Sequence, residues 1–409
     1  YLRSRTELPI YLSHQSSPLT GAVARADTCL VDAALGPIIQ SYARDLIQAT
    51  AAPVYFMGSA GALIPAEEFS GKDSLLSGPA GGVNAVATLS KKYGAPRCVG
   101  FDMGGTSTDV FAYEGILERA ETSEVGGYRI QAPHLKIHTI ASGGGSILQR
   151  DGLRLLVGPR SAGASPGPAF YGKGGPATIT DANVVLGRIL PSHFPSIFGP
   201  DGKSPPDRER SREALAELLA EVGARNDAPP AEEDNLESSS VAAGLPATAG
   251  EPVARDVGHA GATEDQALEE LAQGFLAIAA EQMAGAVRKM TVEQGRDPGK
   301  YVLVSFGGAG GQMACEVAHR AGIKRILFPS LAGLFSAVGI AATRHSELHT
   351  LASGEELVQG LELTRNELLA LLEERKAAGR ATAYNLELRV IPAGSDFSVS
   401  LFYDRWPEA

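Results

Sequence analysis

The 409-residue sequence is poor in cysteine, in aromatic residues and in long apolar runs. Its three cysteines, Cys29, Cys98 and Cys315, lie far apart and have no Cys/His spacing, which argues against a disulfide framework and a structural zinc site. No run of about 18 apolar residues occurs, so no membrane span is expected. Basic residues number 36 against 47 acidic ones, so the sequence also lacks the positive excess typical of nucleic-acid binding. We therefore predict a cytoplasmic protein that binds neither membrane nor nucleic acid.

The sequence instead has abundant glycine, and its ends lack typical terminal features. The 48 glycines gather in short runs beside Ser, Thr and Asp, which indicates loops shaped around a ligand. The chain starts at Tyr1 without the features of a signal peptide, and it stops at Trp406–Ala409 directly after strand-like alternation. We expect a piece of a longer protein, with two or three domains at roughly 150 residues each.

Periodic patterns predict an α/β fold. Helical spacing covers residues 30–50, with Asp27 or Thr28 as the N-cap, and residues 268–290, whereas Ser77–Gly82 reads as a loop before a helix. Residues 208–222 predict a surface helix that ends at Gly223. Residues 226–263 carry prolines, acidic runs and serines but no aromatic residue, and they predict a disordered insertion. Strand patterns are found at residues 54–57, 98–101, 110–113, 137–140, 301–306, 323–328, 386–390 and 397–403.

The turn between residues 101 and 110 is the most informative segment. Two strands flank a tip with the sequence DMGGTSTD. Glycines let backbone N–H groups converge on an anion, and hydroxyl groups can donate to phosphate oxygens. The two aspartates suit a hydrated Mg²⁺ that bridges phosphates. A tight turn with no ligand explains the same residues equally well. The predicted phosphate ligands are Gly104, Gly105, Thr106, Ser107 and Thr108, and the predicted metal ligands are Asp102 and Asp109.

Two further glycine loops favour the ligand interpretation. One follows the 301–306 strand and precedes a helix, a position where loop amides and the helix dipole favour a phosphate or a ribose. The other follows the 137–140 strand. Three such loops in one α/β chain together predict a nucleotide site, although each alone is more often a simple turn. The predicted cofactor-binding residues in these loops are Gly143, Gly144, Gly307, Gly308, Gly310 and Gly311.

Two more residues are candidates for catalysis, each with a structural alternative. His138 lies in an apolar strand before the Gly143 loop, where a core histidine is equally expected. Lys136 projects to the same face and can neutralise phosphate. Asp181 stands at the start of an apolar helix, where a role as N-cap is favoured two to one over catalysis.

Several motifs resemble the hydantoinase A / 5-oxoprolinase family, and further pieces resemble its ATP-dependent 5-oxoprolinase branch. The departures from the family pattern are Gly58, Lys136 and Met313. The motifs are LSGPAGGV (76–83), FDMGGTSTDV (101–110), TDANVVLGR (180–188) and FGGAGG (306–311), and the further pieces are YLSH (11–14), GPRSAGA (158–164), PGPA (166–169), GGP (174–176) and FPSIFGP (194–200).

The resemblance implies a fold of the actin and sugar-kinase type, in which two ribonuclease-H-like lobes with mixed sheets and flanking helices close over ATP. It places the Asp102 hairpin as the second-lobe phosphate loop and the Gly307 loop beside the adenosine. The matching first-lobe loop of the family would precede Tyr1. The implied domains are a partial first-lobe or connecting segment (1–95), the ATPase lobe (96–345, with the insertion at 226–263) and the start of a truncated C-terminal α+β domain (346–409).

The resemblance also implies an activity, namely ATP-dependent hydrolysis of a cyclic amide, foremost 5-oxo-L-proline to L-glutamate, through phosphorylation of the lactam carbonyl. Asp109, His138 and Asp181 are then the catalytic candidates, with ATP and Mg²⁺ as cofactors. The alternatives are the ATP-binding subunit of a hydantoinase or ketone carboxylase, and a nucleotide-binding or partner-docking fragment without turnover. The expected partners are the cyclic amide and either a second copy or a hydantoinase B-type domain.

Overall fold

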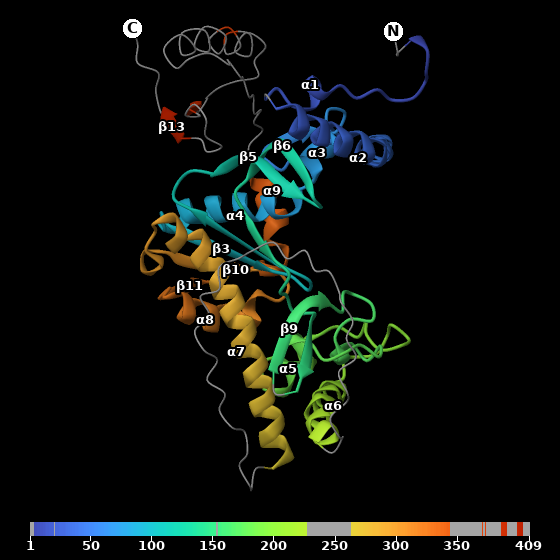
Figure 1. Cartoon of the computed structure of the whole chain (residues 1–409), viewed down its shortest axis with the longest axis vertical. Coiled ribbons are helices and arrows are strands. Elements are labelled where there is room, and N and C mark those ends of the chain that lie inside the picture. The colour runs from blue at the N-terminus through green and yellow to red at the C-terminus, as the bar shows by residue number, and fades with distance from the viewer. Residues whose placement is uncertain are drawn as a thin grey trace, which may run out of the picture.

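The computed structural model describes residues 4–226 except 20 and 153, residues 263–343, and short stretches at 370, 373, 386–390 and 399–403 (Figure 1). These residues form an α/β protein, as the sequence predicts. Its helices are α1 (Ser13–Ser16), α2 (Ala22–Ala49), α3 (Gly71–Ser74), α4 (Ser77–Tyr93), α5 (Ile179–Val185), α6 (Arg208–Asn226), α7 (Glu264–Met290), α8 (Gly310–Ala321) and α9 (Phe335–Ala342).

A mixed five-stranded sheet lies at the centre, in the order β11-β10-β3-β4-β7. Strand β10 runs parallel to β11 and β3, whereas β4 runs antiparallel to β3 and β7. The other strands form separate two-stranded sheets. The strands are β1 (Tyr55–Met57), β2 (Leu63–Pro65), β3 (Cys98–Met103), β4 (Thr108–Tyr113), β5 (Arg119–Val125), β6 (Tyr128–Leu135), β7 (His138–Ile140), β8 (Ser146–Asp151), β9 (Arg154–Ser161), β10 (Val302–Phe306), β11 (Arg325–Leu327), β12 (Leu386–Val390) and β13 (Val399–Tyr403).

Helices cover both faces of this sheet (Figure 1). Because successive strand residues alternate in direction, β3 sends Phe101 and Met103 into a core formed with α7 and α8. Cys98 from the same strand and Phe306 from β10 enter a second core with α4 and α9. The loops after β3 and β10 therefore emerge together at one edge of a sheet that is buried on both sides.

Helix α4 begins inside the glycine motif that the sequence analysis assigned to a loop. Pro79 is tolerated because it occupies the first turn, where backbone N–H groups have no helical partner. A Cβ on Gly81 would lie 2.5 Å from the carbonyl oxygen of Ser336, and a Cβ on Gly339 would lie 1.8 Å from the carbonyl oxygen of Gly81. The glycines thus let the backbones of α4 and α9 touch.

Substitution of Gly339 by Ala is expected to destabilise the protein by about 3 kcal/mol, because neither backbone can yield to the added methyl group. The control is Gly78→Ala, since Gly78 lies in the partner helix α4 but has no atom within 4 Å of its added Cβ. Chemical denaturation of both variants checks this prediction. Equal stabilities would contradict the close contact between α4 and α9.

Two predicted helix boundaries were wrong. Helix α2 begins at Ala22 after Gly21, not after Asp27 or Thr28. The polar groups of these two residues are used elsewhere, since Asp27 accepts a hydrogen bond from the backbone N–H of Arg129 (3.2 Å) and Thr28 donates to the carbonyl of Ala24 (2.6 Å). Helix α6 continues through Gly223 to Asn226, because an isolated helical glycine costs only about 1 kcal/mol.

The sequence analysis did not anticipate the β5–β6 and β8–β9 hairpins. Strand β6 packs against α2, and β9 packs against α7. Residues 227–262, which hold almost all of the predicted disordered insertion, lie outside the described residues, and so does most of the predicted 346–409 domain. Among the described helices, none has the length and apolar character needed to cross a bilayer.

Candidate active site

The predicted phosphate loop is the tip of the β3–β4 hairpin. In this hairpin Asp102 pairs with Asp109, and Met103 pairs with Thr108. The backbone N–H of Gly104 donates to the carbonyl of Ser107 over 3.0 Å and closes the turn. The tip stands at the carboxyl end of β3, beside the end of the parallel strand β10. This is the edge of a parallel pair where α/β proteins place their ligands.

The structure brings all three glycine loops together at this edge. The N–H of Gly144 donates to the carbonyl of Gly104 (3.0 Å), and the N–H of Gly145 donates to that of Gly105 (2.6 Å). On the other side, the N–H of Ala309 donates to the carbonyl of Met103 over 2.9 Å. The hairpin tip thus lies between the 141–146 and 307–311 loops, although 160 residues separate those loops in the sequence.

The glycines of these loops have two different roles. A Cβ on Gly143 would lie 2.8 Å from the carbonyl oxygen of Gly104, and a Cβ on Gly307 would lie 2.4 Å from Oδ1 of Asp102, so both positions serve close packing. Gly307 also has a φ of +84°, which side-chain-bearing residues rarely adopt. By contrast, a Cβ on Gly105, Gly308 or Gly311 would meet no atom within 4 Å. These three positions leave room for a ligand.

The glycines with packing roles include four that the sequence analysis assigned to the cofactor. Two of them are Gly143 and Gly307, and the other two are Gly144 and Gly310. A Cβ on Gly144 would lie 3.0 Å from the hydroxyl oxygen of Thr180, and a Cβ on Gly310 would lie 2.8 Å from the hydroxyl oxygen of Ser305. Their side-chain direction therefore faces protein. A ligand can reach these four residues only through their backbone.

Asp102 and Asp109 form a carboxylate pair on the sheet face that carries α4 and α9. Asp102 accepts a hydrogen bond from the hydroxyl of Ser336 in α9 (3.3 Å), and Asp109 accepts one from Thr139 in β7 (2.5 Å). Burial, followed by the repulsion of Asp109, raises the pKa of Asp102 to about 6. Burial also raises the pKa of Asp109, against the hydrogen bond from Thr139. The pair is therefore suited to a cation.

The three hydroxyl residues of the tip do not share one environment. Thr106 is exposed and Ser107 is partly buried, so both can contact a ligand. Thr108 is fully buried, and its hydroxyl donates to the carbonyl of Ser142 over 2.5 Å. This bond holds the 141–146 loop against the hairpin, so the prediction that the Thr108 side chain binds phosphate is replaced by a structural role.

Substitution of Thr108 by Val is expected to destabilise the protein by roughly 1–3 kcal/mol, because it leaves the buried carbonyl of Ser142 without its donor. Thr108→Ser keeps the donor and should cost less. Thermal unfolding of the two variants measures this difference. If both lost the same stability, the hydroxyl of Thr108 would not be joining the two loops.

His138 does not lie with the aspartate pair. In β7 the neighbouring Thr139 is the cross-strand partner of Asp109, so His138 projects to the opposite face of the sheet. There burial and then Lys289 lower the pKa of His138, while Glu293 opposes them. Lys136 donates to the side-chain oxygen of Gln294 over 2.9 Å. The geometry therefore separates His138 and Lys136 from the predicted phosphate ligands.

Asp181 is fully buried and makes four hydrogen bonds as an acceptor. The donors are the backbone N–H of Phe170 (2.7 Å), the backbone N–H and hydroxyl of Thr178 (2.8 and 2.7 Å) and the hydroxyl of Ser211 (2.8 Å). Burial raises the pKa of Asp181 despite these bonds. Thr178, not Asp181, is the N-cap of α5. The predicted N-cap role of Asp181 is therefore wrong, and its carboxylate instead joins three segments, which is a structural role.

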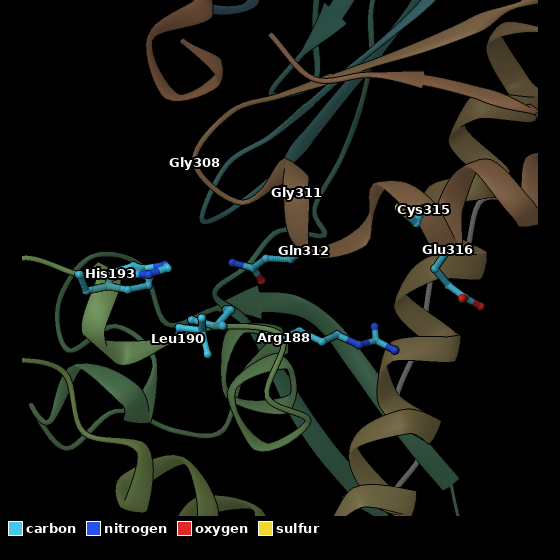
Figure 2. A pocket seen from close by; sticks show the side chains of 10 residues that line it. Arg188, Leu190, His193, Gly308, Gly311, Gln312, Cys315 and Glu316 are labelled. Atoms are coloured by element: carbon cyan, nitrogen blue, oxygen red, sulfur yellow. The ribbon is translucent and has the colours of Figure 1, made fainter. Parts of the chain in front are cut away.

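A cavity of about 500 Å³ opens beside the 307–311 loop (Figure 2). Gly308, Gly311 and Gln312 form one side of it, and the segment after α5 forms the other with Ile189, Leu190 and Phe194. The sequence analysis gave no role to Gln312 or to residues 189–194. Its position directly after the glycine run 307–311 is the only feature of the sequence that could have indicated Gln312 as a site residue.

No group of three or more His, Cys, Asp or Glu side chains capable of holding a metal ion is found in the part of the chain that the structure describes. The two aspartates therefore offer an incomplete ligand set. Mg²⁺ commonly binds in this way, with one or two carboxylates, water and the phosphates of its nucleotide.

Comparison with known proteins gives consistent matches. The Hydantoinase/oxoprolinase family model matches residues 25–349. The 5-oxoprolinase of Dictyostelium discoideum is 38% identical over 349 residues, which cover 81% of this chain and 25% of that protein. The caprolactamase subunit alpha of Pseudomonas jessenii is 28% identical over 415 residues, covering 96% of this chain and 53% of that protein.

A solved structure shares the fold. The crystal structure of the ATP-dependent caprolactamase from Pseudomonas jessenii aligns with a TM-score of 0.71 at 24% identity, over 99% of this chain and 55% of that one. The chain spans about a quarter of the length of the curated 5-oxoprolinases that it matches.

Proposed function

Because this chain belongs to the hydantoinase/oxoprolinase family, we propose that it carries the ATP site of an enzyme that hydrolyses a cyclic amide. The proposed substrate is 5-oxo-L-proline and the product is L-glutamate, as the names of several relatives suggest. The observation that carries the proposal is the junction of the three glycine loops. Their shared hydrogen bonds create one edge at which backbone N–H groups, hydroxyls and carboxylates meet.

The hairpin tip is proposed to hold the terminal phosphates. Gly105 leaves open space for them, and Thr106 and Ser107 offer hydroxyl donors. Loop amides of this kind bind anions through fixed partial charges. Because phosphoryl transfer relies mostly on positioning and on charge neutralisation, such a rigid edge is suited to it.

Asp102 and Asp109 are proposed to hold Mg²⁺. The raised pKa of Asp102, caused by burial and by Asp109, means that the pair lacks a counter-charge of its own. Mg²⁺, when bound, would neutralise the negative charge of the phosphates. The hydrogen bonds from Thr139 and Ser336 each occupy one oxygen of Asp109 and Asp102 and restrict the rotation of these carboxylates.

The chemistry explains why ATP is needed. Amide resonance makes a lactam resistant to water at neutral pH, and phosphorylation of its carbonyl oxygen exposes the carbon to attack by water. Cleavage of the ring C–N bond then follows, and a second water releases phosphate. His138 lies on the opposite face of the sheet from the aspartate pair, and both carboxylate oxygens of Asp181 already accept buried hydrogen bonds. We therefore propose Asp109 as the catalytic residue in this chain.

The adenosine is proposed to lie in the cavity beside Gly308, with the whole site in a cleft of the actin and sugar-kinase type. In that arrangement residues 96–345 form the ATPase lobe, residues 1–95 belong to the first lobe or its connection, and residues 346–409 begin a C-terminal domain. A relative named as a subunit alpha suggests that this chain also works with a partner, for which we propose a hydantoinase B-type domain or a second copy.

Phosphate release tests this function. The purified protein with ATP and Mg²⁺ should release phosphate when 5-oxo-L-proline is added, with one glutamate formed per phosphate. A response to hydantoin or to a ketone would instead favour the ATP-binding subunit of a hydantoinase or of a ketone carboxylase. ATP binding without turnover on any of these compounds would leave only a nucleotide-binding module.

A further inference from the structure

Gln312 is one of the polar residues that line the cavity, together with Arg188, His193 and Glu316. Gln312 occupies the first turn of α8, and its backbone N–H donates to the carbonyl of Ala309 over 3.0 Å. Figure 2 shows its amide nitrogen turned toward the side of the cavity where His193 lies, and its oxygen turned toward the side of Leu190. The orientation of this amide decides whether a ligand meets a donor or an acceptor.

Asn183 fixes that orientation through a chain of two hydrogen bonds. Asn183 is fully buried in α5, and its amide nitrogen donates to the carbonyl of Ile179 over 2.9 Å. Because a carbonyl can only accept, the nitrogen of Asn183 must face it. The same nitrogen donates to Oε1 of Gln312 over 3.4 Å. The oxygen of Gln312 is thus held toward α5, which leaves its NH₂ group for the cavity.

We propose that the amide nitrogen of Gln312 donates a hydrogen bond to a ring nitrogen of the adenine base, with Asn183 as its positioning residue. This inference rests on the proposed function, since it requires a nucleotide in the cavity. The walls suit a flat heteroaromatic ring, because Ile189, Leu190 and Phe194 supply an apolar side and Gly308 and Gly311 leave the opposite side open. A base seated between them presents its edge to Gln312.

The proposal is specific enough to be tested atom by atom. Adenine carries acceptor nitrogens at positions 1, 3 and 7, and in each deaza analogue of ATP one of them is replaced by a C–H group. Isothermal titration calorimetry of the purified protein with ATP and the 1-deaza, 3-deaza and 7-deaza analogues measures each affinity. One analogue should bind about tenfold more weakly than ATP, because one hydrogen bond to the partly buried amide of Gln312 is lost.

The variant Gln312→Met keeps the length of the side chain and removes the donor. It should bind ATP and the discriminated analogue with equal affinity, about tenfold below the wild-type affinity for ATP. Gln312→Glu should bind ATP more weakly still, because it places an acceptor against an acceptor. His319→Ala, on the same helix but outside the cavity, should keep the wild-type pattern. Asn183→Leu should also lose the discrimination, because it frees the amide of Gln312 to rotate.

The outcomes separate this inference from the proposed function. If the wild-type protein binds no ATP, the proposed function fails and the inference fails with it. If it binds ATP but treats all three analogues alike, or if Gln312→Met preserves the difference, only the role of Gln312 is overturned. Should Asn183→Leu fail to fold, the Gln312 variants still decide the matter, because Gln312 is only partly buried.

Discussion

Under the proposed function, replacement of Asp109 by Asn is expected to lower the rate of ATP-coupled lactam hydrolysis by at least about 100-fold, the scale on which preorganised electrostatic groups act in catalysis. Asn keeps the shape of the side chain and can still accept the hydrogen bond from Thr139. It removes only the charge that would hold Mg²⁺ beside the phosphates. Stopped assays of phosphate and glutamate, with saturating ATP and Mg²⁺, give the rate.

The fold of Asp109→Asn is checked by denaturation of that variant without ligand, and Asp102→Asn tests the cost of burying the carboxylate pair. Because the pKa of Asp102 is raised from 3.8 to about 6, the folded protein binds this proton more tightly than the unfolded chain does. Stability of the ligand-free wild type should therefore fall as pH rises from about 4 to about 6. Asp102→Asn should reduce that fall, with the remainder due to the raised pKa of Asp109, and it should be the more stable protein at pH 7.

An Asp109→Asn variant that folds and turns over at the wild-type rate would remove the hairpin from the mechanism. A loss of activity together with a loss of structure would point to a structural role for the carboxylate. The combination expected here, in which activity falls while ligand-free stability holds or rises, is typical of residues kept for function at a cost in stability.

Replacement of Asp181 by Asn has the second large effect, on stability. The variant should lose roughly 2–4 kcal/mol of unfolding free energy. Its amide nitrogen would face the backbone N–H and the hydroxyl of Thr178, which are both donors, and none of these buried groups could bond to water instead. Urea denaturation measures the loss. Asp45→Asn, at an exposed position of α2, is the matched control and should be nearly neutral.

Activity completes the test of Asp181. The molecules that remain folded should hydrolyse the lactam at the wild-type rate, because this carboxylate uses its oxygens to join α5, α6 and the segment around Phe170. A stable but inactive Asp181→Asn protein would restore Asp181 as a catalytic candidate.

The sequence was informative wherever a signal was local. A glycine-rich turn between two β-patterned runs predicts a hairpin, and β3 and β4 are confirmed as its strands. The strand at 301–306 followed by glycines is likewise confirmed as β10 before α8. The positions of the loops relative to each other required the sheet order, which brings β10 next to β3 and which no local pattern encodes.

Other features were beyond the sequence because they depend on tertiary contacts. The composition of Ser77–Gly82 is typical of a loop. The segment is nevertheless helical, because its glycines let α9 pack directly against the backbone of α4. Thr108 looks the same as Thr106 in the sequence, yet only Thr108 is buried. The bond from Asn183 to Gln312 joins residues 129 positions apart, so spacing within a motif cannot find it.

The contact between α4 and α9 has a further consequence for the aspartate pair. Ser336, which donates to Asp102, lies one turn before Gly339 on α9. Any residue that widens the crossing of the two helices would withdraw this hydroxyl and leave the carboxylate turned differently. A genetic screen for lost activity should therefore recover substitutions at Gly81 and Gly339, which lie outside the cavity and the three glycine loops.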